Sequence, residues 1–342
     1  MDLFLFVLMS ALTGLSITGG YHRLFAHRTY RCNQALKILF LGFGAAALQN
    51  SALSWSSDHR DHHRYVDNPK DPYSIKKGFF WAHMGWIFYV NPNDRTYDNA
   101  MDLSQDRWVI FQHKHYGAVA LVFGLLFPLL LGVLLNNVWG ALVWGVLARV
   151  SFVHHATFLI NSAAHVFGKQ PYTSQNSARD NAILAFFTFG EGYHNFHHTF
   201  AADYRNGIRW WQWDPTKWLI YICSSLGLAS DLTRTKELLI VRARLQQEKT
   251  LAIQPHWPPQ WNQDFQKRLD QLQARVEKGF QNWQETKIAY RRWKRESRVA
   301  FSARARREKK RIWRREMRYY RKLMRESWVM YRMQLREARG FS

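Results

Sequence analysis

Residues 117–135 read GAVALVFGLLFPLLLGVLL, nineteen consecutive positions without a charged side chain. A helix needs about 20 apolar residues to cross a hydrocarbon core of about 30 Å. Two further apolar runs occupy residues 138–160 and residues 3–20. Helices satisfy all of their backbone polar groups internally, which a bilayer requires. The sequence therefore predicts three membrane-spanning helices, and the runs at 117–135 and 138–160 form a hairpin.

Charged residues beside the spans indicate the orientation of the chain. The run at residues 3–20 is followed by four basic residues, Arg23, Arg28, Arg31 and Lys37. The residue before it is Asp2. Because cytoplasmic flanks are enriched in Lys and Arg, we predict that the segments after this span, and the C-terminus, are cytoplasmic. The only two cysteines, Cys32 and Cys223, indicate neither a disulfide framework nor a thiolate metal site.

Histidines gather in three short motifs, HRLFAH, HRDHH and HNFHH. They supply eight imidazoles: His22, His27, His59, His62, His63, His194, His197 and His198. The last two motifs share the spacing i, i+3, i+4, which places three imidazoles on one face of a helix. A single histidine on an apolar face is more often a core residue than a ligand. Two copies of the same three-histidine pattern favour a metal site.

A ninth histidine, His165, ends the motif NSAAH just after the predicted span at residues 138–160. A single tetrahedral zinc uses three or four ligands, so eight or nine imidazoles suit two metal ions. Imidazole binds iron, copper, nickel and zinc, and ligand type alone does not choose among them. We therefore predict an all-histidine site for two metal ions at the membrane surface.

The motifs GYHRLFAHR, DHRDHH, NSAAH and GEGYHNFHH, in this order with apolar spans between them, resemble those of the integral-membrane fatty acid desaturases. The resemblance is to the acyl-CoA and acyl-lipid delta-9 (stearoyl-type) group and covers about residues 3–218. It implies an all-α, multi-pass membrane bundle with a cytosolic helical cap. Members of the family usually have two spans before the first histidine motif, and this sequence has one. We expect a desaturase domain at residues 1–240, a linker at 241–260 and a basic helical extension at 261–342.

The resemblance also implies roles for individual residues. Nine histidines would bind two iron ions, with Asn161 beside one of them through a water: His22, His27, His59, His62, His63, His165, His194, His197 and His198. Asn50 and Asp58 match positions that contact the acyl carrier in the family. Trp55, Trp81, Trp86 and Phe158 are candidate walls of an apolar tunnel that fixes the acyl chain, and an ordinary place in the core is the alternative for each.

The resemblance implies a cis double bond, made with dioxygen and two electrons at the diiron site. The sequence has no dinucleotide-binding glycine motif and no haem or iron–sulfur cysteine pattern, so the electron donor is expected to be an external ferredoxin or b-type cytochrome with its reductase. Ser57, Val90 and Asn91 stand where animal acyl-CoA enzymes carry three cations, which leaves both an acyl-CoA and an acyl-lipid open as substrate. A membrane diiron hydroxylase of fatty acids or alkanes is one alternative function. A non-catalytic membrane protein that binds metal or a partner is another.

The C-terminal extension is strongly basic. The chain has 342 residues and a formal net charge of +23, and residues 261–342 contain 25 Lys and Arg against 9 Asp and Glu. Basic residues and Trp, Tyr and Leu recur there at helical intervals, which predicts one or two long helices. Three roles stay open: solvated helices without a partner, contact with anionic membrane lipids, and docking of an acidic redox partner. We do not expect nucleic acid to bind.

Overall fold

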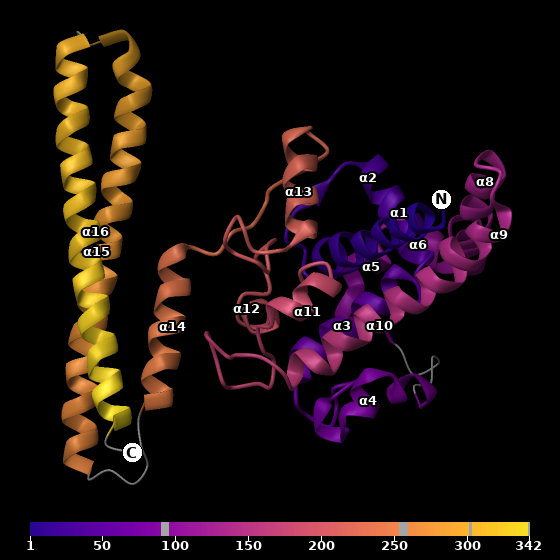
Figure 1. Ribbon diagram of the computed structural model, residues 1–342, viewed down its shortest axis with the longest axis horizontal. Helices are drawn as coiled ribbons and strands as arrows, with labels where there is room; N and C mark the ends of the chain where they lie inside the picture. The colour runs from indigo at the N-terminus through magenta and orange to yellow at the C-terminus, as the bar shows by residue number, and fades with distance from the viewer. Residues whose placement is uncertain (90–95, 253–258, 301–302, 341–342) are drawn as a thin grey trace. The chain divides into compact units, whose positions relative to one another are not determined.

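The computed structural model is mostly helical (Figure 1), which confirms the predicted all-α fold. It describes residues 1–89, 96–252, 259–300 and 303–340. The chain forms two compact units. The first contains Met1–Gln170 and Ser174–Thr235, and the second contains Pro171–Thr173 and Lys236–Ser342.

Three helical stretches of the first unit are long and apolar enough to cross a membrane, as predicted: Asp2–Ala26, Tyr116–Leu134 and Val138–His165. The first consists of α1 (Asp2–Leu15) and the π-helix η1 (Ser16–Ala26). The second consists of α7 (Tyr116–Leu121), η6 (Val122–Leu126) and α8 (Phe127–Leu134). The third consists of α9 (Val138–Gly140), η7 (Ala141–Ala148), α10 (Arg149–Asn161) and η8 (Ala163–His165).

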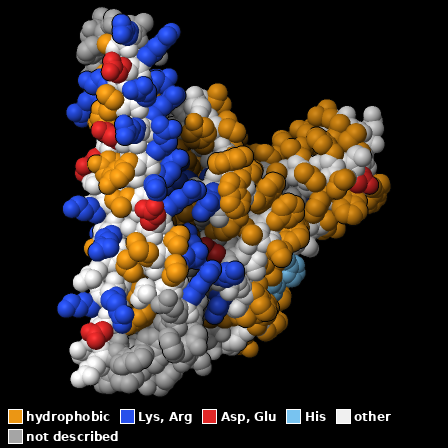
Figure 2. All heavy atoms as spheres, turned by 60° about the vertical axis from the view of Figure 1, so that its left-hand side comes forward, with side chains coloured by type: hydrophobic (Ala, Val, Ile, Leu, Met, Phe, Trp, Pro, Cys, Tyr) orange, Lys and Arg blue, Asp and Glu red, His pale blue; other side chains and the backbone are white. Residues whose placement is uncertain are grey.

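The outward faces of these spans are apolar. Leu130, Val133, Trp139 and Leu147 are each more than half exposed, and Figure 2 shows hydrophobic side chains over this part of the molecule. Contiguous apolar surface of this kind is rare on soluble monomers and is typical of contact with lipid or a partner. The exposed faces thus agree with the prediction from hydrophobic length.

Shorter elements carry the chain between and beyond the spans. Two of them hold histidine motifs: α3 (Ala52–Tyr65) and α12 (His194–Thr199). The others are α2 (Gln34–Ala45), η2 (Ile75–Lys77), α4 (Phe79–His83), η3 (Gly85–Phe88), η5 (Asp98–Ala100), α5 (Met101–Ser104), α6 (Arg107–Lys114), α11 (Ala182–Phe187) and α13 (Pro215–Ser225). Strands β1 (Arg31–Cys32) and β2 (Ala229–Ser230) pair antiparallel, with Cys32 opposite Ala229.

A fully buried arginine ties the third span to two neighbouring segments. Arg149 Nη2 donates to the carbonyl oxygen of Gly124 at 2.7 Å, and Nη1 donates to the carbonyl oxygen of Ala46. Ala46 follows the last residue of α2, so the cation meets the negative end of that helix. Ionisable residues inside a membrane are costly unless they find such partners. Arg149 therefore links α2, the second span and the third span.

We expect Arg149→Lys to lower the thermal stability of the purified protein by several degrees. One ammonium group cannot replace a guanidinium fork that reaches two helices, so at least one buried carbonyl loses its partner, at a cost of about 1–3 kcal/mol. The matched control is Arg107→Lys, because Arg107 is exposed. Thermal unfolding in detergent, followed by circular dichroism, measures both variants. An equal midpoint for Arg149→Lys and the wild type would contradict the assigned role.

The second unit is a long helical hairpin with a third helix beside it. Helices α15 (Pro259–Ala300) and α16 (Ala303–Gly340) run antiparallel, and α14 (Glu237–Ala252) precedes them (Figure 1). This confirms the predicted basic helical extension. Residues 237–252 form a helix that overlaps the linker expected at 241–260, whereas residues 253–258 lie outside the described part of the chain.

The core of the second unit explains why α14 is helical. Its Leu245 and Ala252 are fully buried against apolar side chains of α15 and α16. The hydroxyl of Tyr331 in α16 also donates to the carbonyl oxygen of Leu245 at 2.6 Å. Because these partners come from much later in the chain, the local sequence alone gives little sign of the packing.

Candidate metal centre

The first histidine motif lies in the π-helical end of the first span. The backbone N–H of His27 donates to the carbonyl oxygen of His22 at 3.0 Å, the i to i+5 hydrogen bond of a π-helix. A π-helix has more residues per turn than an α-helix, so side chains five positions apart point to similar directions. The local helix type thus turns His22 and His27 toward the same space.

The second and third motifs each divide between two sites. The sequence placed the three imidazoles of each motif on one face, but that face spans two clusters in the structure. On α3, His59 and His63 belong to one cluster and His62 to the other. On α12, His197 belongs to the first cluster, whereas His194 and His198 belong to the second. Each helix therefore contributes to both clusters.

The structure brings all nine predicted histidines together in these two clusters. The ligand atoms within each cluster lie within 4.8 Å of one another. The five-histidine cluster contains His22, His27, His59, His63 and His197. The four-histidine cluster contains His62, His165, His194 and His198. The rings of His63 and His198 stack with centroids 4.2 Å apart, so the two clusters adjoin.

The Nε2 atoms of neighbouring histidines face one another directly. In the five-histidine cluster, His27 and His59 are separated by 2.8 Å. The Nε2 atom of His197 lies 3.0 Å from that of His22 and 2.9 Å from that of His63. In the four-histidine cluster, His194 lies 3.1 Å from His165 and 3.0 Å from His198.

The donor set fits two transition-metal ions. Burial, reinforced by the neighbouring histidines, lowers the pKa of six members well below 6.5: His27, His59, His63, His194, His197 and His198. Neutral imidazoles have a lone pair to offer, and two facing nitrogens can share only one proton between them. A cation at the centre of each cluster would accept several lone pairs at once. The role of each histidine as a ligand stays a prediction.

Hydrogen-bond partners on the other ring nitrogen orient several of these histidines. His62 Nδ1 lies 2.9 Å from Asp71 Oδ1, and His165 Nδ1 lies 2.7 Å from Ser177 Oγ. His22 Nδ1 lies 3.0 Å from Glu191 Oε2, within ion-pair distance. Metal-bound histidines usually have such a partner, which leaves Nε2 for the metal. These contacts therefore support metal binding through Nε2.

A buried ion network holds the carboxylate behind His22 in place. Arg23 Nη2 donates to Glu191 Oε1 at 2.8 Å and to Asp214 Oδ1 at 3.0 Å. Burial alone would raise the pKa of Glu191, but its interactions with His22 and Arg23 outweigh this effect and lower the pKa to about 2. The carboxylate is therefore ionised and orients the His22 ring.

Sequence reasoning missed these outer partners. Glu191 lies inside the motif GEGYHNFHH, three residues before its first histidine. Asp71 lies in the Asp, Asn and Pro turn that follows HRDHH. Their closeness to a histidine motif was the sequence signal that could have identified them as partners of the candidate ligands. Their spacing does not say which imidazole they meet, because His22 comes from a distant part of the chain.

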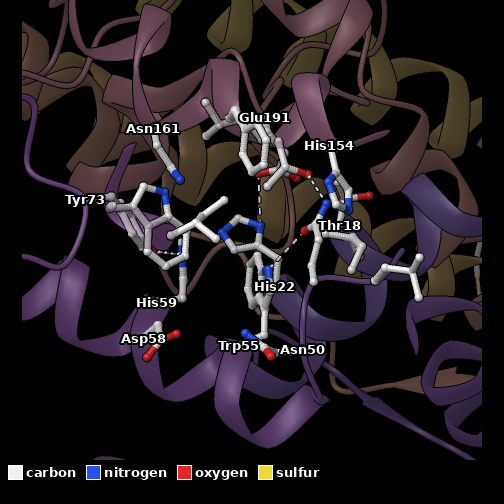
Figure 3. A pocket seen from close by; sticks show the side chains of 18 residues that line it. Thr18, His22, Asn50, Trp55, Asp58, His59, Tyr73, His154, Asn161 and Glu191 are labelled. Carbon is white, nitrogen blue, oxygen red and sulfur yellow. Dashed lines mark hydrogen bonds and ion pairs between the residues drawn. The ribbon is translucent and has the colours of Figure 1, made fainter. Parts of the chain in front are cut away.

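A cavity of about 320 Å³ adjoins the clusters (Figure 3). His22, His59 and Glu191 form part of its wall. Five of the six residues predicted to contact the substrate or its carrier line it: Asn50, Trp55, Asp58, Trp86 and Phe158. Asn161 also lines the cavity, and its predicted contact with a metal through water stays a prediction.

The cavity has walls from several elements. Figure 3 shows Tyr73, His59 and Asn161 on one side and Thr18 and His154 on the other. Trp55 stacks on His59 with ring centroids 5.0 Å apart, so one aromatic wall touches a candidate ligand. The sequence did not single out Thr18, Tyr73 or His154, because nothing in their local motifs marks them.

Four other candidate positions take no described part in the cavity. Trp81 is not among the lining residues that the structure describes. Ser57 donates a hydrogen bond to Asn99 Oδ1 at 2.8 Å. Val90 and Asn91 lie outside the described residues. These positions therefore do not distinguish an acyl-CoA from an acyl-lipid as the substrate.

Comparison with known proteins gives one family and several relatives. The model of the fatty acid desaturase family matches residues 2–221. A probable acyl-CoA desaturase of Schizosaccharomyces pombe is 44% identical over 245 residues, covering 71% of this chain and 51% of that protein. Acyl-CoA desaturase 1 of Saccharomyces cerevisiae is 43% identical over 252 residues, 73% of this chain and 49% of that protein. The chain thus spans about half the length of these two yeast relatives.

A third relative carries a different substrate in its name. The sn-1 stearoyl-lipid 9-desaturase of Anabaena variabilis is 35% identical over 220 residues, which cover 64% of this chain and 79% of that protein. Both histidine clusters, from His22 to His198, lie within the 2–221 match to the family model. Residues 236–342, which include the basic hairpin, lie beyond that match.

Proposed function

The chain belongs to the fatty acid desaturase family, and from this membership we propose that it introduces a cis double bond between carbons 9 and 10 of a saturated fatty acyl chain. Dioxygen and two electrons would be consumed. One observation carries the proposal: two adjoining clusters of buried histidines border an aromatic-walled cavity. The clusters would hold redox-active metals, and the cavity has room for part of an acyl chain beside them.

We propose iron as the metal in both clusters. The five-histidine cluster would hold one ion and the four-histidine cluster the other, with Asn161 beside one of the two ions through a water. When bound, the two irons supply the dioxygen chemistry that removes hydrogen from an unactivated methylene, which no side chain can do. Zinc is disfavoured because it is redox-inactive and is usually saturated by four ligands.

The protein's own residues would position the substrate. Trp55, Trp86 and Phe158 present apolar surface to the cavity, which favours a methylene chain and excludes water. His59 lies directly behind Trp55, so a chain packed on that ring would lie close to a candidate ligand. Asn50 and Asp58 add polar groups to the same wall. Fixing one pair of carbons near the metals in this way would set the position of the double bond.

Substrate carrier, electron supply and orientation complete the proposal. An acyl-CoA or an acyl-lipid would be the substrate, since relatives named for each kind match the chain. An external ferredoxin or b-type cytochrome with its reductase would supply the electrons. The enzyme would be a multi-pass integral membrane protein with its catalytic face and C-terminus in the cytoplasm.

Expression in a host that lacks monounsaturated fatty acids tests the activity. We expect a 9,10 double bond in both sixteen-carbon and eighteen-carbon chains, because the cavity would measure from the carrier end. Gas chromatography with mass spectrometry locates the bond, and His197→Ala serves as the inactive control. A bond that shifts with chain length would contradict carrier-end counting. A hydroxylated product would favour the hydroxylase alternative, and bound metal without oxygen consumption would favour a non-catalytic protein.

A further inference from the structure

Charge is distributed unevenly along the hairpin of α15 and α16. Residues 287–325, which we call the distal half, contain 18 Lys and Arg against 3 Asp and Glu. The rest of the tail, residues 261–286 and 326–342, which we call the proximal half, contains 7 Lys and Arg against 6 Asp and Glu. Almost the whole positive excess of the tail therefore lies in the distal half.

The proximal half accounts for the folding of the second unit. Its core contains Leu245 and Ala252 of α14, Phe265, Leu269 and Val276 of α15, and Tyr331 and Leu335 of α16. Ion pairs reinforce it: Arg242 contacts Glu277 and Lys249 contacts Asp270, both at 2.6 Å. Opposite charges are thus matched where α14 packs on the hairpin. The excess of cations occurs away from this core and does not contribute to it.

Seven arginines of the distal half form a regular row, which we call the Arg stripe. It contains Arg304, Arg307, Arg311, Arg314, Arg318, Arg321 and Arg325. The alternating spacing of three and four residues keeps them on one face of α16 over about 32 Å. All seven are exposed. Figure 2 shows many Lys and Arg side chains along the hairpin.

The distal half contains too few acidic residues to balance its own basic ones. Three acidic residues cannot pair with 18 basic ones, and like charges three or four residues apart destabilise a helix. A row of cations kept on a folded helix is therefore suited to an external polyanion. Arginine also binds phosphate groups through two parallel hydrogen bonds, which suits a surface of phosphates.

Apolar side chains lie among these cations. Ile288, Ile312 and Tyr319 of the distal half are each more than half exposed. Trp313 packs near Tyr290, with ring centroids 6.5 Å apart. Basic helices that also present Trp, Tyr and aliphatic side chains are typical of the membrane interface, where lipid headgroups meet acyl chains.

The spans favour a lipid partner over a soluble one. A chain that crosses the bilayer keeps its segments outside the bilayer close to lipid headgroups, at high effective concentration. An acidic protein or a nucleic acid would have to be recruited from solution. We propose that the distal half of the hairpin, through the Arg stripe, binds the anionic headgroup surface of a membrane. This inference does not depend on the proposed desaturase activity.

Binding of the full-length protein to vesicles tests the proposal. The protein is placed in phosphatidylcholine nanodiscs and mixed with vesicles of phosphatidylcholine alone, or of phosphatidylcholine with phosphatidylglycerol. Co-sedimentation of nanodiscs with vesicles measures binding. We expect binding only to the anionic vesicles, and weaker binding as salt is raised.

Two matched quadruple variants localise the effect. The distal variant replaces Arg307, Arg311, Arg314 and Arg318 with Gln, and the proximal variant replaces Lys267, Arg268, Arg275 and Lys278 with Gln. All eight side chains are exposed, so each variant removes four surface charges without changing the core. The distal variant is expected to bind anionic vesicles more weakly by roughly two to three orders of magnitude at low salt. The proximal variant should stay close to the wild type.

Helical content and metal content, measured on every variant, show whether the hairpin and the histidine clusters are intact. Equal binding to both kinds of vesicle would overturn the proposal. Equal losses in the two quadruple variants would overturn it as well, because they would show an effect of net charge without a localised surface. Tighter binding to duplex RNA or to an acidic protein than to anionic vesicles, at equal anion concentration, would assign the surface to another class of partner.

Discussion

Replacement of His165 with alanine is expected to remove about half of the bound metal and to abolish the activity. His165 is one of only four histidines in its cluster, and its Nε2 lies 3.1 Å from that of His194. The variant leaves three ligands there, whereas the five-histidine cluster stays complete. A catalytic metal supplies several kcal/mol, so the loss of one ion should lower the rate by at least about a thousandfold.

Elemental analysis and a single-turnover assay measure the two effects separately. His115→Ala is the control, since His115 is exposed and belongs to neither cluster. Ser177→Ala gives a graded comparison: Ser177 bonds the other ring nitrogen of His165, and loss of such a partner usually costs about 10–100-fold. If His165→Ala keeps its full metal content and activity, His165 is a structural residue and the four-histidine cluster has been assigned wrongly.

The sequence was sufficient to single out the histidines but not to assign each one to a cluster. Repeated spacing indicated His59, His62 and His63 together, and the same spacing recurred at His194. Helical periodicity places such residues on one face, yet that face is wide enough to border two sites. Only the packing of α3 against α12 decides which imidazole meets which partner. This information is absent from local spacing.

Local sequence patterns also predicted only part of the fold. Hydrophobic length predicted the three spans, because the requirement for a span is local. The π-helical geometry of η1 was not predicted, although it is what brings His22 and His27 to one side. Residues 237–252 form a helix whose buried partners, such as Phe265 and Tyr331, are distant in sequence. In that segment tertiary contacts supply what the local pattern lacks, whereas the geometry of η1 is a local change of helix type.

The cavity was anticipated in part. Trp55, Trp86 and Phe158 were singled out as aromatic residues near the histidine motifs, and all three line it. Trp81 is the same residue type as Trp86 and lies five positions before it, but it is not among the described lining residues. Aromatic type alone does not distinguish a wall residue from its neighbour. The direction of the side chain depends on how η3 and α4 turn.

Arg23→Met is expected to be the most destabilising substitution among those considered. Arg23 is almost completely buried and donates to Glu191, to Asp214 and to the backbone oxygen of Tyr204 at 2.8 Å. Its removal leaves two buried carboxylates without their cation, and breaking such a network from one side costs about 3–5 kcal/mol. Since Glu191 also contacts His22, we expect a lower metal content as a second consequence.

A control variant distinguishes the loss of this buried network from the loss of a positive charge in general. The control is Arg31→Met: Arg31 lies 3.7 Å from Asp231, and the two side chains are 84% and 66% exposed. Exposed pairs contribute at most about 1 kcal/mol, so the control should unfold close to the wild type. The double variant Arg23→Met with Glu191→Gln should recover part of the lost stability, because it removes one uncompensated carboxylate while the amide oxygen still accepts a hydrogen bond from Asn206 Nδ2. Thermal and denaturant unfolding in detergent measure all three, and a double variant less stable than Arg23→Met would show that charge burial is not the cause.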